Sequence, residues 1–269
     1  MKKRGGKELF LQDKKGQLTV FVVIALVVVA IGILIYLFYP QISSTLGGST
    51  QDPNAFIQNC IEDEIQSTID LVSLQGGNLE PILYVLNNDE QISYLCYTSN
   101  YYKTCVVQQP LLKEHIELEI ASGIESSARN CFNELKSSFE GRGYTVSLTE
   151  GATSISILPG KVETTFNYSV TLSRTETQKY DSFAVTTNSN LYQFTSIANN
   201  IIDWEATYGN AETTAYMDLN HDLKVEKLSP QSEYGAKIYV LTNRNSLDKF
   251  QFASRSQVFP PGYGIADTK

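Results

Sequence analysis

The sequence predicts an α+β protein, in which an N-terminal transmembrane helix precedes an extracytoplasmic domain of antiparallel sheet packed with about three helices. Two observations predict this class. The first is a run from Leu18 to Tyr39 without a charged side chain. The second is a change of hydrophobic period near Gly143, from about four residues to two. Strands interrupted by helices, without regular βαβ units, are typical of α+β architecture.

The apolar run is long enough to cross a membrane. As a helix, its roughly 22 residues would span about 33 Å, against a hydrocarbon core of about 30 Å. A buried helix of a soluble domain rarely stays apolar on every face for six turns. A cleaved secretory signal would be shorter and would end at a small-residue site. We therefore expect residues 17–39 to lie in membrane lipid.

Charge beside this run predicts the orientation of the chain. Residues 1–16 carry six basic and two acidic side chains, a net charge of +4. Because basic flanks stay in the cytoplasm, residues 40–269 should lie outside the cell membrane. This exported part carries a net charge of −12. Such acidity argues against DNA, RNA or anionic lipid as its main ligand, so no nucleic-acid partner is expected.

The segment from Lys15 to Thr19, Lys-Gly-Gln-Leu-Thr, resembles the class III signal peptides of archaeal type IV pilins. The resemblance implies cleavage between Gly16 and Gln17, followed by packing of the freed hydrophobic helix in a filament core. Two features depart from the family. Phe21 stands where many pilins have Glu, and Pro40 breaks the helix just past the membrane. A plain, uncleaved anchor is the alternative to a processed pilin-like subunit.

The first part of the exported domain predicts a helix, a hairpin and a second helix. Residues 40–51 are rich in Ser, Thr and Gly, which is typical of a flexible linker. A lobe of residues 52–143 follows. Its first helix should begin at Asp52, because Asp accepts backbone hydrogen bonds at an N-cap and Pro53 needs no donor at the next position.

Apolar residues at helical spacing continue this helix to the glycines at 76 and 77. The strand-like runs that follow are 82–86, 92–97 and 103–107, and the last two predict a hairpin. The second helix begins after Pro110 and ends at Gly141. Its apolar stripe consists of Leu112, Ile116, Ile120, Ile124, Ala128, Phe132, Leu135 and Phe139.

Residues 144–259 predict a lobe of antiparallel sheet plus one helix. Strict alternation over residues 161–175 predicts one long strand with a buried side and a wet side. A third helix should run from Phe194 to Gly209. Shorter strands are expected around 146–148, 155–157, 183–185, 224–228, 237–241 and 250–253, and residues 260–269 form a tail.

All four cysteines follow the apolar run, and their even number suits an oxidising exterior. Cys96 and Cys105 lie across the predicted hairpin, so we expect them to form one disulfide. Cys60 and Cys131 point inward from the first two helices and are expected to form the other. Four buried free thiols are the alternative, because spacing alone does not select a pairing.

The short motifs that identify common enzymes are absent, and no cofactor or metal is expected. Asn167 begins an Asn-Tyr-Ser glycosylation sequon on the wet face of its predicted strand. Trp204 beside two carboxylates could suggest sugar binding, but helical neighbours point to different sides. The best candidate contact loop is CYTSNYYKTC, with Tyr97, Tyr101 and Tyr102 as contact residues, because Tyr joins a large contact area to a polar tip. An ordinary disulfide-closed turn without a contact role is the alternative.

These observations predict a single-pass membrane-anchored surface protein that binds or assembles and does not catalyse. Its partners would be membrane lipid and either copies of itself or another surface protein. The alternative is a membrane-tethered hydrolase of envelope polymer that uses a pair of carboxylates. Such an enzyme would need two carboxyl groups about 5 to 9.5 Å apart in a cleft.

Overall fold

The computed structural model describes Val29, residues 52–230 and residues 233–258. The chain divides into two compact units between Gln51 and Asp52, and only the second is described beyond a single residue. Within these described ranges, no helix combines the length and the apolar character needed to cross a membrane. The predictions that fall outside the described residues are the leader (1–16) with its cleavage site at Gly16 and Gln17, the membrane segment (17–39, apart from Val29), the linker (40–51) and the tail (260–269).

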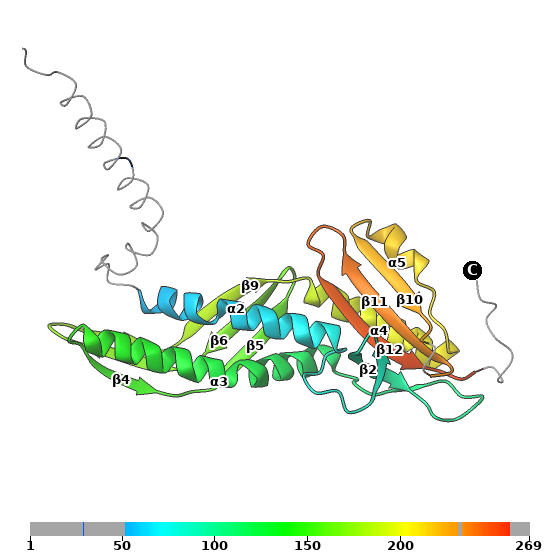
Figure 1. The fold of residues 1–269 in the computed structure, drawn as a ribbon, viewed down its shortest axis with the longest axis horizontal. Coiled ribbons are helices and arrows are strands. Elements are labelled where there is room, and N and C mark those ends of the chain that lie inside the picture. Colours follow the sequence, from blue (N-terminus) through cyan, green and yellow to red (C-terminus); the bar gives the residue numbers. More distant parts are fainter. Residues whose placement is uncertain (1–28, 30–51, 231–232, 259–269) are drawn as a thin grey trace, which may run out of the picture. The chain divides into compact units, whose positions relative to one another are not determined.

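Two long helices lie side by side and antiparallel, as Figure 1 shows. Helix α2 spans Pro53–Leu74 and begins as predicted, since the Asp52 carboxylate accepts a hydrogen bond from the Asn54 backbone N–H at 3.3 Å. Helix α3 spans Leu112–Gly141, and every member of its predicted apolar stripe is buried. The predicted Cys60–Cys131 disulfide joins the start of α2 to the last part of α3.

The largest sheet has six strands and is mixed. Its order is β1 (Tyr84–Asn87), β2 (Glu90–Tyr97), β12 (Lys249–Arg255), β11 (Ala236–Asn243) and β10 (Leu223–Leu228), and β3 (Val106–Val107) pairs with β2. All neighbours are antiparallel except β2 and β12, which are parallel. This one parallel pairing differs from the purely antiparallel sheet that the sequence predicts. It pairs β2, a strand of the predicted hairpin, with β12, the last strand of the domain.

The other strands form two smaller sheets, both antiparallel. One contains β4 (Thr145–Thr149), β7 (Ser169–Ser173) and β8 (Thr177–Tyr180), and the other contains β5 (Thr153–Leu158), β6 (Lys161–Phe166) and β9 (Phe183–Asn188).

The single long strand predicted for residues 161–175 is therefore wrong. Its buried residues do share one side, but the chain changes sheets between β6 and β7 at Asn167 and Tyr168. The reason is a close backbone crossing. The Asn167 N–H donates to the Ala152 carbonyl at 3.0 Å, and a Cβ at Gly151 would lie only 1.9 Å from the Asn167 carbonyl oxygen. β6 and β7 therefore pair with different strands, because the chain that leads into β5 crosses between them at this point.

The main core contains residues from both predicted lobes, on either side of Gly143. At its centre the Phe132 ring of α3 stacks on Tyr168 at 4.2 Å between centroids, and it meets Phe166 and Phe183 edge-on. Helix α4 (Leu191–Tyr208) packs on β2, β3 and β12 and ends at Gly209, whose φ of 74° suits a residue without a side chain. A short helix, α5 (Thr214–Leu219), was not predicted.

Candidate functional site

The predicted contact loop, from Cys96 to Cys105, is closed by a disulfide between its two ends. Its central segment, residues 98–104, is exposed from Ser99 to Lys103, whereas Thr98 is buried. Both cysteines are buried and bonded, as the sequence predicts. Tyr101 and Tyr102 are 52% and 65% exposed at the tip of the loop. Two large aromatic side chains therefore project from a rigid base into solvent.

Tyr102 adopts a left-handed backbone conformation, with φ at 59°. A bulky residue in this region costs on the order of 1 to 3 kcal/mol and persists only where the surroundings fix the backbone. Such outliers concentrate at ligand-contacting segments. The tip of the loop is thus held in an unfavourable shape that exposes its tyrosines.

The end of strand β12 fixes the loop from the other side. The Thr98 backbone N–H donates to the Arg255 carbonyl at 3.0 Å, and the Arg255 guanidinium donates back to the Thr98 carbonyl at 2.7 Å. At the far end of the loop, the Gln257 N–H donates to the Lys103 carbonyl at 3.1 Å. The Cys105 N–H donates to the Ser256 hydroxyl at 2.8 Å. Both ends of the loop are therefore tied to one segment of chain.

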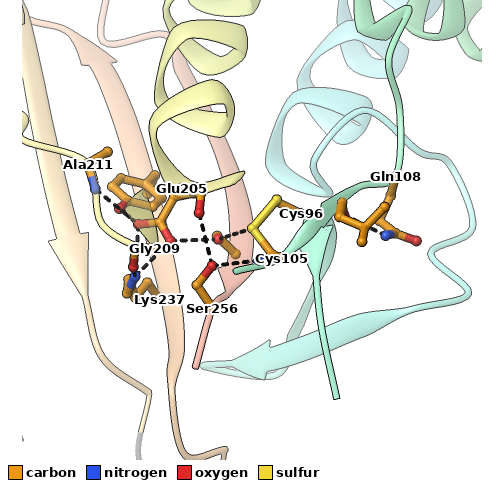
Figure 2. The surroundings of a disulfide bond; sticks show 11 residues. Cys96, Cys105, Gln108, Glu205, Gly209, Ala211, Lys237 and Ser256 are labelled. Atoms are coloured by element: carbon orange, nitrogen blue, oxygen red, sulfur yellow. Dashed lines mark hydrogen bonds and ion pairs between the residues drawn. A yellow bond between two sulfur atoms is a disulfide. The ribbon is translucent and has the colours of Figure 1, made fainter. Parts of the chain in front are cut away.

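A buried polar cluster lies directly behind the disulfide, as Figure 2 shows. Its centre is Glu205 in the last turn of α4, which is 0% exposed. The Ser256 hydroxyl that supports Cys105 donates to the Glu205 backbone carbonyl at 3.0 Å. The Ser254 hydroxyl donates to the Glu205 carboxylate at 3.1 Å and lies 3.6 Å from the Cys105 sulfur. The cluster thus connects helix α4 to the base of the loop.

The Glu205 carboxylate is fully occupied by donors. The Lys237 ammonium donates to its two oxygens at 2.9 and 2.7 Å and to the Gly209 carbonyl at 2.5 Å. The Tyr239 hydroxyl and the Ala211 N–H also donate to Oε1. With Ser254 this makes five hydrogen bonds to a group that has about four lone-pair sites. Glu205 therefore has no lone pair left to accept a further hydrogen bond.

Burial governs the titration of the groups around Glu205. It lowers the pKa of Lys237, although the Glu205 carboxylate opposes this effect by favouring the ammonium. Burial also raises the pKa of Tyr239, and the neighbouring Glu205 charge raises it further. The short distances and the shared hydrogen bonds favour an ionised Lys237–Glu205 pair with a neutral phenol beside it.

The loop has a second support on the outer face of the six-stranded sheet. Tyr97 is half-buried there, with its ring edge-on to Tyr94 at 5.0 Å and under the Arg255 guanidinium at 5.5 Å. Glu233 accepts from the Tyr94 hydroxyl at 2.6 Å and pairs with Arg255 at 3.1 Å. Of the three predicted contact residues, Tyr101 and Tyr102 lie at the tip, whereas Tyr97 lies at the base and packs against the sheet.

Asn167 lies away from this loop, in the exposed break between β6 and β7. Its side chain is accessible, while the next residue of the sequon, Tyr168, is buried against Phe132. Glycosylation of Asn167 stays a prediction.

The buried cluster was not found from the sequence, although two signals were present. Glu205 follows Ile201 by one helical turn and so occupies a position of the apolar stripe of α4. Lys237 alternates with Tyr239 and Leu241 on the buried side of β11. A charged residue at an inward position in each of two elements indicates a buried ion pair.

What this arrangement offers chemically is a set of exposed aromatic and polar side chains on an ordered loop. Across residues 52–230 and 233–258, no three His, Cys, Asp or Glu side chains converge in a way that could hold a metal ion. The loop is instead uncharged except for Lys103, and its Tyr, Ser and Asn side chains give large contact area and adaptable hydrogen bonding. No protein-family model, curated protein or solved structure matches this chain.

Proposed function

We propose that this chain is a single-pass surface protein whose exported domain is a binding module, with residues 98–104 as its contact loop. The observation that carries the proposal is the exposed Tyr102, held in a left-handed conformation by a buried disulfide and by the end of β12. Binding proteins gain affinity when a contact loop is already ordered, because less conformational entropy is lost on association.

The chemistry of the loop favours a protein partner on the cell surface. Tyr101, Tyr102, Asn100 and Ser99 are residue types that are typical of protein-binding loops, and one cation, Lys103, adds a point of charge pairing. The apolar run at 17–39 and its basic flank support an anchor that holds this loop outside the membrane.

A site-specific photocrosslinker tests the contact loop. We would replace Tyr102 by a photoreactive phenylalanine analogue in the full-length chain on intact cells, and place the same analogue at Leu118 as the control. Leu118 lies on α3 and is 71% exposed, close to the 65% of Tyr102. We expect an adduct of discrete mass at position 102, at least fivefold more abundant than at position 118.

The disulfide makes this experiment sharper. A variant with both Cys96 and Cys105 replaced by Ser keeps Tyr102 but removes the covalent link between the two ends of the loop, so the adduct at position 102 should fall severalfold. Equal adduct at positions 102 and 118, or an adduct indifferent to the disulfide, would reject the loop as the contact site.

Topology and processing are tested separately. Tyr102→Cys introduces one thiol beside four bonded cysteines. On intact cells this thiol should react with a membrane-impermeant maleimide. Mass spectrometry of the membrane fraction should give Gln17 as the N-terminal residue if a leader is removed, and Met1 or its neighbour if the anchor is uncleaved. Labelling only after the cells are opened would refute the outward orientation.

A further inference from the structure

Strand β1 forms one edge of the six-stranded sheet. Among the strands that the structure describes, β1 pairs with β2 alone, and β10 lies at the opposite edge. The Val85 side chain of β1 is 3% exposed and belongs to a small apolar cluster with Ile92 and Ile238 on one face of the sheet. β1 is therefore an ordered edge strand, held both by its packing and by its pairing with β2.

The register of β1 with β2 directs part of its backbone away from the sheet. The Tyr94 N–H donates to the Leu83 carbonyl at 2.9 Å, so the backbone of Leu83 faces β2. Because the hydrogen-bonding side alternates along an antiparallel strand, the N–H and C=O groups of Tyr84 and Leu86 face the other way. Such outward groups at an edge are a template for pairing with another strand.

The side chains beside these backbone groups are apolar and exposed. Ile82, Tyr84 and Leu86 are 97%, 38% and 52% exposed, and their alternation along the chain places them on one face. Natural edge strands are usually protected by charged side chains or by a covering element. β10 shows this protection, since three of its six residues are Lys or Glu and α5 packs against it. β1 has no charged residue, so it has the features of a strand-addition site.

Charge at the two ends of this edge indicates the chemistry of the partner. Glu80 precedes β1, Asp89 and Glu90 follow Asn87 and its neighbour, and all three acidic residues are exposed. No Lys, Arg or His occurs in residues 52–102. An extended segment with basic residues at its ends would complement this pattern of charge.

The same charges argue against a second copy of this chain. If the exposed apolar residues of two copies paired antiparallel, with Tyr84 opposite its own copy, Glu80 of one copy would lie beside Asp89 of the other. Like charges across neighbouring strands are destabilising. The partner that fits the edge is therefore a different chain.

We propose that the edge of β1 binds an extended segment of another protein by strand addition. That segment has apolar residues at alternate positions and basic residues at both ends. This inference goes beyond the contact loop and does not use it. The result of photocrosslinking at Tyr102 would leave it unaffected, and the reverse also holds.

A designed peptide tests strand addition to the full-length chain in nonionic detergent. The probe is Lys-Lys-Val-Thr-Val-Thr-Val-Lys-Lys with a fluorescent label, and the measurement is fluorescence anisotropy. One control peptide has Glu in place of the four Lys residues. The other is methylated at the three Val backbone nitrogens, which removes the donors that would face β1 and keeps every charge.

We expect the probe to bind at least about tenfold more tightly than either control peptide, because both the backbone bonds and the charges contribute. Equal binding of the methylated peptide would overturn strand addition. Equal binding of the acidic peptide would overturn the assignment of a basic partner, and absence of binding at millimolar probe would overturn both.

Two variants at one exposed position locate the site. Leu86→Lys places a cation beside the basic probe, and Leu86→Pro removes an outward N–H without removing a bond to β2. Each should weaken probe binding at least about fivefold while circular dichroism stays unchanged. The matched control is Leu118→Lys on α3, where Leu118 is 71% exposed, and it should bind the probe as the unmodified chain does.

The mass of the chain in detergent, measured by light scattering, distinguishes the other occupant. We expect a monomer with and without the Leu86→Lys substitution. A dimer that Leu86→Lys dissociates would assign the edge to a second copy and overturn the proposal, and so would equal weakening of probe binding by Leu86→Lys and Leu118→Lys.

Discussion

Replacing Glu205 by Gln tests whether the buried cluster stabilises the fold and the loop support. Glu205 is 0% exposed, and the Lys237 side chain is 9% exposed. The substitution keeps the shape of the side chain but leaves the ammonium without a countercharge. The new amide would also direct N–H groups at donors, because Ser254, Tyr239 and Ala211 all donate to this carboxylate.

The expected loss is about 3 to 5 kcal/mol in the free energy of unfolding. Removing one partner of a buried ion pair typically costs this much, because the other charge stays in a medium of low polarity. A second substitution, Lys237→Met, should return at least about 1 kcal/mol to the Glu205→Gln variant, since it removes the stranded charge while filling similar space. A typical domain is stable by only about 5 to 15 kcal/mol, so the single variant should be clearly weakened.

The assay is equilibrium unfolding of the full-length chain in detergent by urea, followed by circular dichroism and by fluorescence of the one tryptophan, Trp204. The control is Asp181→Asn. Asp181 pairs with Lys179 at the same 2.7 Å, but with 73% and 61% of the two side chains exposed. The control should change the free energy of unfolding by less than about 0.5 kcal/mol. If Glu205→Gln costs no more than Asp181→Asn, or if Lys237→Met adds to the loss, the role assigned to the pair is wrong.

Replacing both Cys60 and Cys131 by Ser opens a loop with a sequence separation of 71 residues, and it should lower the free energy of unfolding by about 4 kcal/mol. Opening the Cys96–Cys105 disulfide, with a separation of 9, should lower it by about 3 kcal/mol. Urea unfolding of the two variants would contradict this reasoning if the shorter loop proved the more costly to open. Alkaline pH should also unfold the domain. The native state keeps the Tyr239 proton, because its pKa is raised by burial, while the unfolded chain loses it above about pH 10. The contribution of Tyr239 to stability, fully present below pH 10, should therefore fall by up to about 1.4 kcal/mol per pH unit above it, in addition to the loss from Tyr94, whose pKa burial also raises. Tyr239→Phe should flatten this slope between pH 10 and 12, and an unchanged slope would refute the assignment.

Local patterns in the sequence predicted most of the elements. Asp52 with Pro53 marked the start of α2, and Gly209 marked the end of α4 in a left-handed conformation. These signals act within one turn of chain, so they hold wherever the element packs. The disulfide pairings were also predicted, because helical and hairpin periodicity indicated which cysteines faced inward.

Pairings between distant strands were not predicted. The parallel contact of β2 with β12 joins residues about 160 positions apart, as in the Ala253 and Tyr94 pair. The change of sheet at Asn167 depends on the backbone at Gly151 crossing beside it. The alternation of residues 161–175 does not reveal such a crossing. The same residues are buried on one side of the strand, whichever neighbouring strand it pairs with.

The contact role of the loop stays a prediction, made from the composition of residues 96–105. Only the packed sheet placed Tyr97 at the base of this loop and Tyr102 at its tip with a positive φ. The cluster around Glu205 needed α4, β11 and β12 together, since the carboxylate is on α4 and its donors come from β11, from β12 and from Ala211 in the loop after α4. No local pattern specifies which distant donor reaches a buried carboxylate.

By itself, the sequence determined where α2 begins and where α4 ends, the apolar stripes of the long helices, and that an apolar run precedes an acidic domain, because each of these depends on neighbours along the chain. Only the tertiary structure decided which strands pair, that Glu205 and Lys237 meet behind the Cys96–Cys105 disulfide, and which tyrosines are exposed. These depend on the packing of segments that are distant in sequence, where the cost of burying a polar group is offset only by partners that the fold brings to it.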